Sequence, residues 1–380
     1  MPSSTARLLL TGDVMTGRGI DQILPQPCDP ALYESYTSSA LDYVALAEQA
    51  HGPIPRRVPY SYVWGDALDD IERRRSDFHL INLETALTTD GMAEPKGINY
   101  RMHPANIGVL SAAHIDACVL ANNHILDWGV AGLSDTLEAL RRAGIAAVGA
   151  GCNAVEASAP LVHPLPGGGR ILVFAFGCRD SGILSTWRAG ENRAGVNLLD
   201  DLSRTTVAGI ADLVKVAKQP GDIVIASIHW GGNWGYEIGD AERSFAHQMI
   251  DDAAVDLVHG HSSHHPKGVE VWHGKLVLYG CGDLINDYEG ITGYEEYRDD
   301  LVLMYFPLVR LNDGMLQALE MVPFRIRAFR LEHAPAEDVA WLTAMLSQEG
   351  RQFGTWIELA GDGHLLLRWP CHGPGRPGSC

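Results

Sequence analysis

The most constraining feature of this sequence is a series of short apolar runs that each end abruptly in polar residues. Five polar clusters follow such runs, at Gly12–Arg18, Asn82–Glu84, Asn122–His124, His229–Gly232 and Gly260–His265. Apolar runs of this length are typical of buried strands. Because parallel strands of an α/β protein present their carboxyl ends at one edge of the sheet, we expect the clusters to meet there.

The segments between these clusters indicate helices mixed with parallel and antiparallel strands. A helical pattern over 133–143 leads directly into a short strand, as in βαβ units. The segments 269–272 and 275–279 are expected to pair as a hairpin, and so are 301–311 and 316–329. The predicted fold class is α/β with mixed sheets, and a hydrophobic content of 46% is enough for a large core.

One main domain is expected over residues 1–330. An insertion at 20–75 contains several prolines and two helical stretches, and it could line or cover a site. A helix and a β-hairpin over 331–370 form a C-terminal appendage packed on the same domain. Residues 371–380 are expected to be a disordered tail.

The charge balance narrows the partners that this chain is expected to bind. Lysine and arginine number 29 against 47 aspartate and glutamate residues, which gives a formal net charge of −18. A surface of this sign repels polyanions, so neither nucleic acids nor membranes are expected as partners. The sequence leaves the oligomeric state open.

The apolar runs and the cysteines together predict the cellular compartment of the protein. No signal peptide or membrane anchor is expected, because the first apolar run, Leu8–Leu10, is followed at once by Thr11–Asp13. The seven cysteines are scattered and form no CxxC pair, which argues against a disulfide framework. We therefore predict a cytoplasmic protein.

The donor atoms in the polar clusters suit a divalent cation. They are carboxylate and amide oxygens and imidazole nitrogens, without cysteine, as hard or borderline cations require. Mn²⁺, Zn²⁺ or Fe²⁺ would fit if the histidines bind directly, and Ca²⁺ or Mg²⁺ would fit if oxygen ligands dominate. The candidate catalytic acids and bases are Asp13, His124, His229, His261 and Asp283.

In their order and composition the clusters resemble those of the CapA family of poly-γ-glutamate and capsule synthesis proteins, a branch of the calcineurin-like metallophosphoesterase superfamily. The resemblance covers about residues 7–330 and is closest at Gly12–Arg18, Leu120–Gly129, Gly260–Lys267 and Gly280–Asp283. It implies a four-layer αββα fold, in which two packed β-sheets have helices outside and a metal centre lies at the strand ends.

The resemblance also implies roles for individual residues. The implied metal ligands are Asp13, Asn123, His229, His261 and His264. His124 is expected to contact the substrate or leaving group. Glu84 is a further candidate metal ligand, with an ordinary ion pair as the alternative, and Asp283 either orients a histidine or binds metal.

Departures from the superfamily pattern argue for one metal ion rather than two. Met15 stands where the first motif has a histidine, and a thioether is a poor ligand for a hard cation. The bridging aspartate of the second motif is replaced within Asn82–Glu84, and the last motif reads His-x-x-His instead of His-x-His. Two-metal catalysis requires a bridging carboxylate and several ligands on each ion.

Three residues near the clusters are candidate substrate-binding residues. Arg18 shares a short loop with Asp13, and its guanidinium matches a phosphate or a carboxylate. Arg101 is a further candidate carboxylate binder. Trp230 would suit a peptide side chain at an aromatic mouth, with core packing as its alternative.

Three functions fit these features. The first is a metal-dependent enzyme that acts on a peptide by His/Asp acid–base chemistry. Epimerisation at a Cα is favoured because Met15 and the altered second motif weaken a two-metal centre and leave the acid–base groups intact. The resemblance allows this reaction, since the CapA-like branch includes epimerases of ribosomally made peptides such as lasso-peptide precursors. The alternative is hydrolysis of a phosphoester or amide. An accessory role in poly-γ-glutamate or capsule synthesis ranks third, because family members with that role generally carry an N-terminal anchor.

Overall fold

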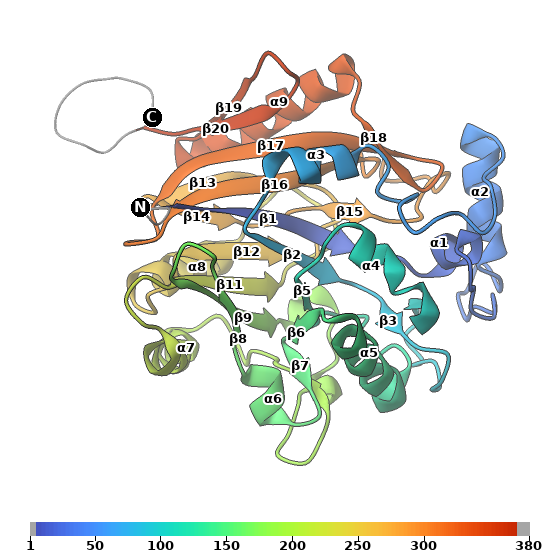
Figure 1. Cartoon of the computed structure of the whole chain (residues 1–380), viewed down its shortest axis with the longest axis horizontal. Coiled ribbons are helices and arrows are strands. Elements are labelled where there is room, and N and C mark those ends of the chain that lie inside the picture. The colour runs from blue at the N-terminus through green and yellow to red at the C-terminus, as the bar shows by residue number, and fades with distance from the viewer. Residues whose placement is uncertain (1–4, 371–380) are drawn as a thin grey trace.

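Two β-sheets pack face to face at the centre of the protein, as seen in a computed structural model that describes residues 5–370 (Figure 1). The larger sheet has ten strands, two of which lie beside its main path: β15 (Asp283–Ile285) pairs with β1, and β18 (Arg330–His333) pairs with β17. The main path runs through β19 (Trp356–Leu359), β20 (Leu365–Arg368), β17 (Leu316–Arg327), β16 (Leu301–Arg310), β1 (Thr5–Val14), β2 (Phe78–Leu83), β5 (Ala117–Val119) and β6 (Ala146–Val148).

The smaller sheet has six strands, of which the central four are parallel. Their order is β13 (Val269–Trp272), β14 (Lys275–Leu278), β12 (Leu257–His261), β11 (Ile223–His229), β9 (Arg170–Gly177) and β8 (Leu161–Pro164). Two short pairs complete the strands of the described residues: β3 (Ala86–Leu87) with β4 (Arg101–Met102), and β7 (Ala150–Gly151) with β10 (Gly195–Val196).

Alternation along the strands divides the core into three parts. In β1, Leu8 lies in the core between the two sheets, whereas Leu9 belongs to the core on the outer face of the larger sheet. In β9, Val173 lies between the sheets and Phe174 packs on the outer face of the smaller sheet. Each sheet is therefore buried on both faces, as its nearly continuous apolar strands require.

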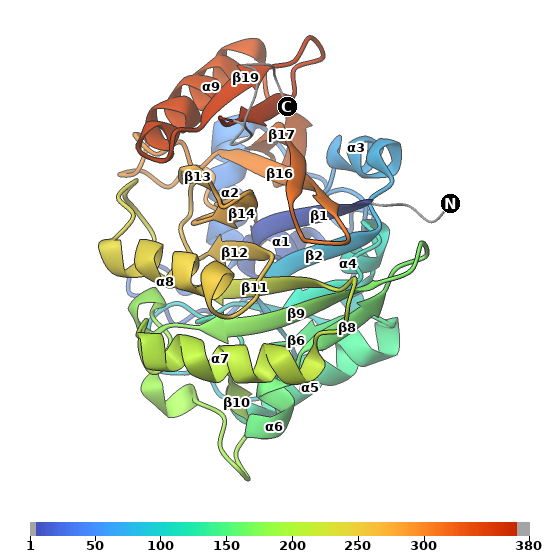
Figure 2. The ribbon, with the colours of Figure 1, turned by 90° about the vertical axis from the view of Figure 1, so that its left-hand side faces the viewer.

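Helices cover the outer face of each sheet, so the four-layer fold expected from the sequence is confirmed (Figures 1 and 2). The larger sheet is covered by α1 (Arg18–Ile23), α2 (Leu41–His51), α3 (Ala67–Arg74), α4 (Gly108–Ala112) and α5 (Gly129–Ala143). The smaller sheet is covered by α7 (Arg204–Ala217) and α8 (Asp240–Asp251), whereas α9 (Ala336–Gly350) adds to the core between the sheets. The remaining helical segments are α6 (Ala154–Ser158), η1 (Pro104–Asn106), η2 (Arg179–Ser181), η3 (Ser185–Trp187) and η4 (Arg351–Phe353). Within residues 5–370, none of the helices combines the length and the apolar character needed to cross a bilayer.

Strand register brings the polar clusters together, as the sequence predicts. The parallel pairing of β1 places Asp13 opposite Asn82 of β2 and opposite Asp283 of β15. In the smaller sheet, the parallel pairing of β11 and β12 places His229 opposite His261. The arrowheads of β1, β2, β11 and β12 accordingly point to the same side of the molecule (Figure 1).

The structure also shows where the expected domain boundaries fall. The insertion at 20–75 contains α2 and α3, close to the two predicted helical stretches. The helix and hairpin of 331–370 are α9 with β19 and β20, and β20 pairs with β17, so this hairpin extends the larger sheet. The boundary drawn after residue 330 falls inside β18. The tail at 371–380 lies outside the described residues.

A close backbone approach at Gly12 generates the first prediction. A Cβ at Gly12 would lie 1.7 Å from the carbonyl oxygen of Gly282, so Gly12→Ala must force β1 away from the segment before β15. We expect the free energy of unfolding to fall by about 1–3 kcal/mol. Urea unfolding measures this change. The control is Gly209→Ala in α7, because a Cβ there meets nothing within 4 Å, and this variant should raise the free energy of unfolding by up to about 1 kcal/mol. Equal stability of Gly12→Ala and wild type would contradict the packing.

Candidate metal centre

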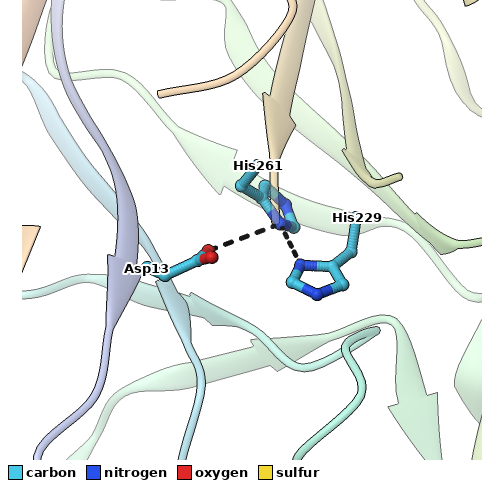
Figure 3. Close-up of side chains that lie close together, drawn as sticks. All are labelled: Asp13, His229 and His261. Carbon is cyan, nitrogen blue, oxygen red and sulfur yellow. Dashed lines mark hydrogen bonds and ion pairs between the residues drawn. The ribbon is translucent and has the colours of Figure 1, made fainter. Parts of the chain in front are cut away.

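Asp13, His229 and His261 converge where the strand ends of the two sheets meet (Figure 3). His229 Nδ1 lies 2.8 Å from His261 Nδ1, which in turn lies 3.8 Å from Asp13 Oδ1. One ligand atom from each residue lies within 4.8 Å of the other two, and all three side chains are fully buried. The geometry therefore brings together three of the metal ligands implied by the sequence.

Asp13 also belongs to a cluster of three carboxylates. One oxygen each of Asp13, Glu84 and Asp283 lies within 4.8 Å of the others, and all three residues are buried. Within residues 5–370, no lysine or arginine nitrogen lies within 4.0 Å of any of their carboxylate oxygens. Desolvated carboxylates at this distance repel one another, and a divalent cation would offset that repulsion. The residues present therefore fit a metal, and the choice of one ion over two stays a prediction.

Burial sets the protonation state of these groups in the metal-free protein. Burial, reinforced by the Asp283 carboxylate, raises the pKa of Asp13 to about 7. Burial and the Asp13 carboxylate raise the pKa of Glu84 well above its usual range. Burial holds the pKa values of His229 and His261 well below theirs, so both imidazoles are neutral, as metal ligation requires.

A chain of buried hydrogen bonds determines which nitrogen of His261 carries the proton. The carbonyl of Thr11 only accepts, so His259 Nε2 donates to it at 2.8 Å. Burial lowers the pKa of His259 to about 4, so the ring is neutral and its Nδ1 accepts from the Ser227 hydroxyl at 3.0 Å. The Ser227 oxygen is then left to accept from His261 Nε2 at 2.9 Å. His261 therefore presents a lone pair at Nδ1, the atom that faces His229 and Asp13.

His124 forms a second functional group beside the carboxylates. Its Nδ1 lies 2.6 Å from Asp127 Oδ2, and its Nε2 lies 3.8 Å from Glu84 Oε1. Lys96 pairs with the other oxygen of Asp127 at 2.7 Å and also donates to the carbonyl of Asn123. Burial lowers the pKa of His124 to about 4, so its ring is neutral, with Nδ1–H donating to Asp127 and Nε2 free to accept a proton.

His264 is placed differently from the sequence-based expectation. Its Nδ1 lies 3.0 Å from Asp283 Oδ1, and Asn286 donates to the other oxygen of Asp283 at 2.9 Å. Burial lowers the pKa of His264, but its pairing with Asp283, together with the carboxylates of Asp13 and Asp299, raises the pKa overall. His264 belongs to neither group of converging ligand atoms, whereas Asp283 belongs to one. The structure thus favours Asp283 over His264 as a metal ligand.

A cavity of about 530 Å³ opens directly beside these groups. Asn123, His124 and His264 line its inner end. Most of the remaining wall is aromatic or aliphatic, formed by Tyr36, Ile98, Tyr100, Trp234, Tyr288, Ile291 and Tyr294. A volume of this size is typical of a small-molecule or peptide site.

The three predicted substrate-binding residues have different surroundings. Arg18 lines the cavity but is buried, donating to Asp287 and to Glu34 Oε1 at 3.1 Å, so its role with substrate stays a prediction. Arg101 is not among the residues that line the cavity, and it donates to the carbonyl of Asp29 at 3.0 Å. Trp230 is 2% exposed in the core outside the smaller sheet, so its prediction as a substrate-binding residue is wrong and the packing alternative holds.

The neighbours of the site explain other sequence features. The Gly17 amide donates to the sulfur of Met15 at 3.2 Å. At this position, where the superfamily pattern has a histidine, the side chain therefore contacts the backbone. Asn82 donates to Asp13 Oδ1 at 2.7 Å and so orients that carboxylate. Asn123 Oδ1 lies 3.0 Å from His229 Nε2, close to the predicted ligand position.

Sequence reasoning missed several residues that support the site. Asp127 follows His124 by three positions within the stretch Leu120–Gly129, and that spacing was a usable signal. The residues without such a signal are Lys96, Ser227 and His259, because their roles depend on contacts between distant segments.

The hydrogen-bond chain through Ser227 makes a prediction about metal affinity. Ser227→Ala removes the acceptor of His261 Nε2–H, and we expect divalent metal affinity to fall about 10–100-fold. Ser227→Thr keeps the hydroxyl and should retain affinity. Calorimetric titration with Zn²⁺ measures affinity, and ¹⁵N chemical shifts of labelled histidine report the tautomer. Wild-type affinity and an unchanged tautomer in Ser227→Ala would contradict the assignment.

The raised pKa of Asp13 makes a prediction about pH. Below about pH 7 the metal-free protein holds a proton on Asp13, whereas a metal-bound carboxylate cannot hold one. Metal affinity should therefore rise with pH across neutrality, with proton release on binding. Calorimetry in buffers of different ionisation enthalpy counts the released protons, and Asp13→Asn is the control that should release fewer. A metal affinity that does not change between about pH 6 and about pH 8 would contradict this prediction.

Comparisons with known proteins identify the family of this chain. The family model of the bacterial capsule synthesis protein PGA_cap matches residues 7–288. A probable polyglutamine synthesis accessory protein of Mycobacterium tuberculosis (strain H37Rv) is 45% identical over 349 residues, which are 91% of this chain and 92% of that protein. The PGA biosynthesis protein CapA of Bacillus subtilis is 27% identical over 235 residues, covering 61% of this chain and 58% of that protein.

A solved structure described as a novel phosphatase from Mycoplasma pneumoniae covers 88% of this chain and 96% of its own, with 12% sequence identity and a TM-score of 0.44. No functional conclusion follows from that similarity. The family model, by contrast, spans most of the sequence, and the mycobacterial relative is similar over nearly its whole length. This chain therefore belongs to the PGA_cap family of bacterial capsule synthesis proteins.

Proposed function

We propose that this protein is a metal-dependent hydrolase of amide bonds that takes part in the synthesis of a glutamine or glutamate polymer. Family membership supports the polymer, because these relatives are named for polyglutamine and PGA synthesis. The sequence alone ranks hydrolysis second and an accessory role in polymer synthesis third, both behind peptide epimerisation. The names of the relatives support a role in the synthesis of a polymer joined by amide bonds, and so favour amide hydrolysis over epimerisation.

The cavity beside the metal centre is the observation that carries the choice of an amide over a phosphoester. The arginine and the lysine in its wall already form ion pairs within the protein. Arg18 pairs with Glu34 and Asp287, and Lys96 pairs with Asp127. A phosphate dianion entering the cavity would have to compete with these carboxylates. The predominantly aromatic and aliphatic wall instead suits a neutral group.

The residues of the site supply the parts of an amide hydrolysis. Two groups of converging side chains would hold metal: Asp13 with His229 and His261, and Asp13 with Glu84 and Asp283. A divalent cation held there would act as a Lewis acid on an amide carbonyl. His124 donates Nδ1–H to Asp127, so its Nε2 is placed to take a proton from the attacking water and to pass it to the leaving nitrogen as the C–N bond breaks.

Epimerisation at a Cα is the second candidate, favoured by one specific observation. Two histidines that line the same cavity, His124 and His264, are each bonded to a carboxylate, at 2.6 Å and 3.0 Å. Inversion at carbon needs an acid and a base on opposite sides of the centre, and two such pairs could supply them.

Mass spectrometry of capped glutamine and γ-glutamate oligomers, incubated in D₂O with Mn²⁺ or with EDTA, tests the proposal. We expect chain cleavage that EDTA abolishes and that His124→Ala slows at least about a hundredfold. His163→Ala, on β8 and against Phe78, is the matched control and should cleave at the wild-type rate. Deuterium gain without cleavage would support the epimerase instead. Phosphate release from a phosphomonoester without oligomer cleavage would contradict the choice of amide.

A further inference from the structure

The cavity at the metal centre shares wall residues with two others. A second cavity, of about 540 Å³, shares Tyr36 and Ile291 with it, and a third, of about 480 Å³, shares Tyr288, Ile291 and Asp299. Ile291 lines all three. The segment 286–299, between β15 and β16, therefore forms a common wall from which binding space extends in two directions.

The second cavity offers an apolar surface. It lies between α2 and the segment 286–299, with Ala45, Leu46 and Ile291 in its wall. Several apolar side chains here are unusually open to solvent, with Tyr36 66%, Leu46 36% and Ile291 38% exposed. Clustered exposure of this kind beside a candidate active site is typical of a ligand-binding surface.

The third cavity is polar. Its wall contains three acidic residues, Glu289, Asp299 and Asp300, against two arginines, Arg325 and Arg327, because burial and those arginines lower the pKa of His51 and leave its imidazole neutral. Three of these groups have partners within the protein: Glu289 contacts His51 at 3.1 Å, Asp300 pairs with Arg298 at 2.7 Å, and Arg325 pairs with Asp338 at 3.3 Å. Such a wall provides hydrogen-bond donors and acceptors without a net field that would select anions.

The common wall is held in place on both sides. Tyr294 stacks on Trp234 with ring centroids 4.0 Å apart, and the hydroxyls of Tyr288 and Tyr100 lie 2.9 Å apart. At Gly290, a Cβ would lie 3.1 Å from the backbone oxygen of Leu46, so this glycine lets the segment pack closely on α2. The three cavities are therefore preformed parts of one surface.

We infer that the two outer cavities are subsites for a polyamide chain with neutral, hydrogen-bonding side chains, bound on either side of the amide that lies at the metal centre. This inference rests on the proposed function and adds the class of substrate: an extended chain of several residues with carboxamide side chains. Ile291 is the contact common to the subsites. The excess of carboxylates in the third cavity and the net charge of −18 both disfavour a polyanionic chain.

Equilibrium binding to the full-length protein in EDTA tests the subsites separately from cleavage. Capped oligomers of two and eight glutamines, and an eight-residue γ-glutamate oligomer, are titrated by calorimetry. We expect the glutamine octamer to bind at least about tenfold more tightly than the dimer, with little dependence on salt. Leu46→Asp, in the wall of the second cavity and of neither other, should weaken octamer binding by about tenfold and dimer binding by less than about twofold. The charge-matched control is Val216→Asp, at an apolar position of α7 that is 89% exposed and lines none of the three cavities. This variant should change the binding of neither the dimer nor the octamer.

Equal binding of dimer and octamer, or octamer binding that Leu46→Asp leaves unchanged, would overturn the subsites. Tighter binding of the γ-glutamate octamer with steep salt dependence would overturn the choice of a neutral chain. Length-dependent binding in a protein that cleaves no oligomer would support the subsites and contradict the hydrolase, so the two failures are distinguishable.

Discussion

Three buried carboxylates, Asp13, Glu84 and Asp283, lie within 4.8 Å of one another at the carboxyl edge of the larger sheet, and the rest of the site is arranged around them. Removing one carboxylate from water is already costly, and placing three together adds mutual repulsion. The metal-free protein lessens this cost by raising the pKa of Asp13 and of Glu84 through burial and their neighbours. A divalent cation offsets it more fully, so metal binding and the fold are thermodynamically linked.

The candidate ligands come from both sheets, which makes the site dependent on how the sheets pack. Asp13 and Asp283 are fixed by neighbouring strands of the larger sheet, whereas His229 and His261 end strands of the smaller one. The apolar core between the sheets sets the separation of these two halves. Ser227 and His259 bond His261 back to the Thr11 carbonyl of β1, and so connect the smaller sheet to the larger one behind the site.

Much of this arrangement could be predicted from the sequence, because strand ends are visible as apolar runs that stop at polar residues. The meeting of Asp13, His229 and His261 follows from that pattern and from parallel pairing. Three things could not be predicted in this way. The burial of Arg18 depends on Glu34 and Asp287, which are distant in sequence. Trp230 follows a histidine at the site, yet its ring turns into the outer core. Which of His264 and Asp283 lies among the converging ligand atoms depends on the local path after β12, which local periodicity does not determine.

Anomalous X-ray diffraction from crystals of the protein grown with Zn²⁺ tests the metal centre, because it locates the ion without reference to activity. We expect a peak bonded to a carboxylate oxygen of Asp13, to His229 and to Nδ1 of His261, at about 2.0–2.2 Å. A peak elsewhere on the protein, or a site at these strand ends that stays empty at saturating Zn²⁺, would contradict it.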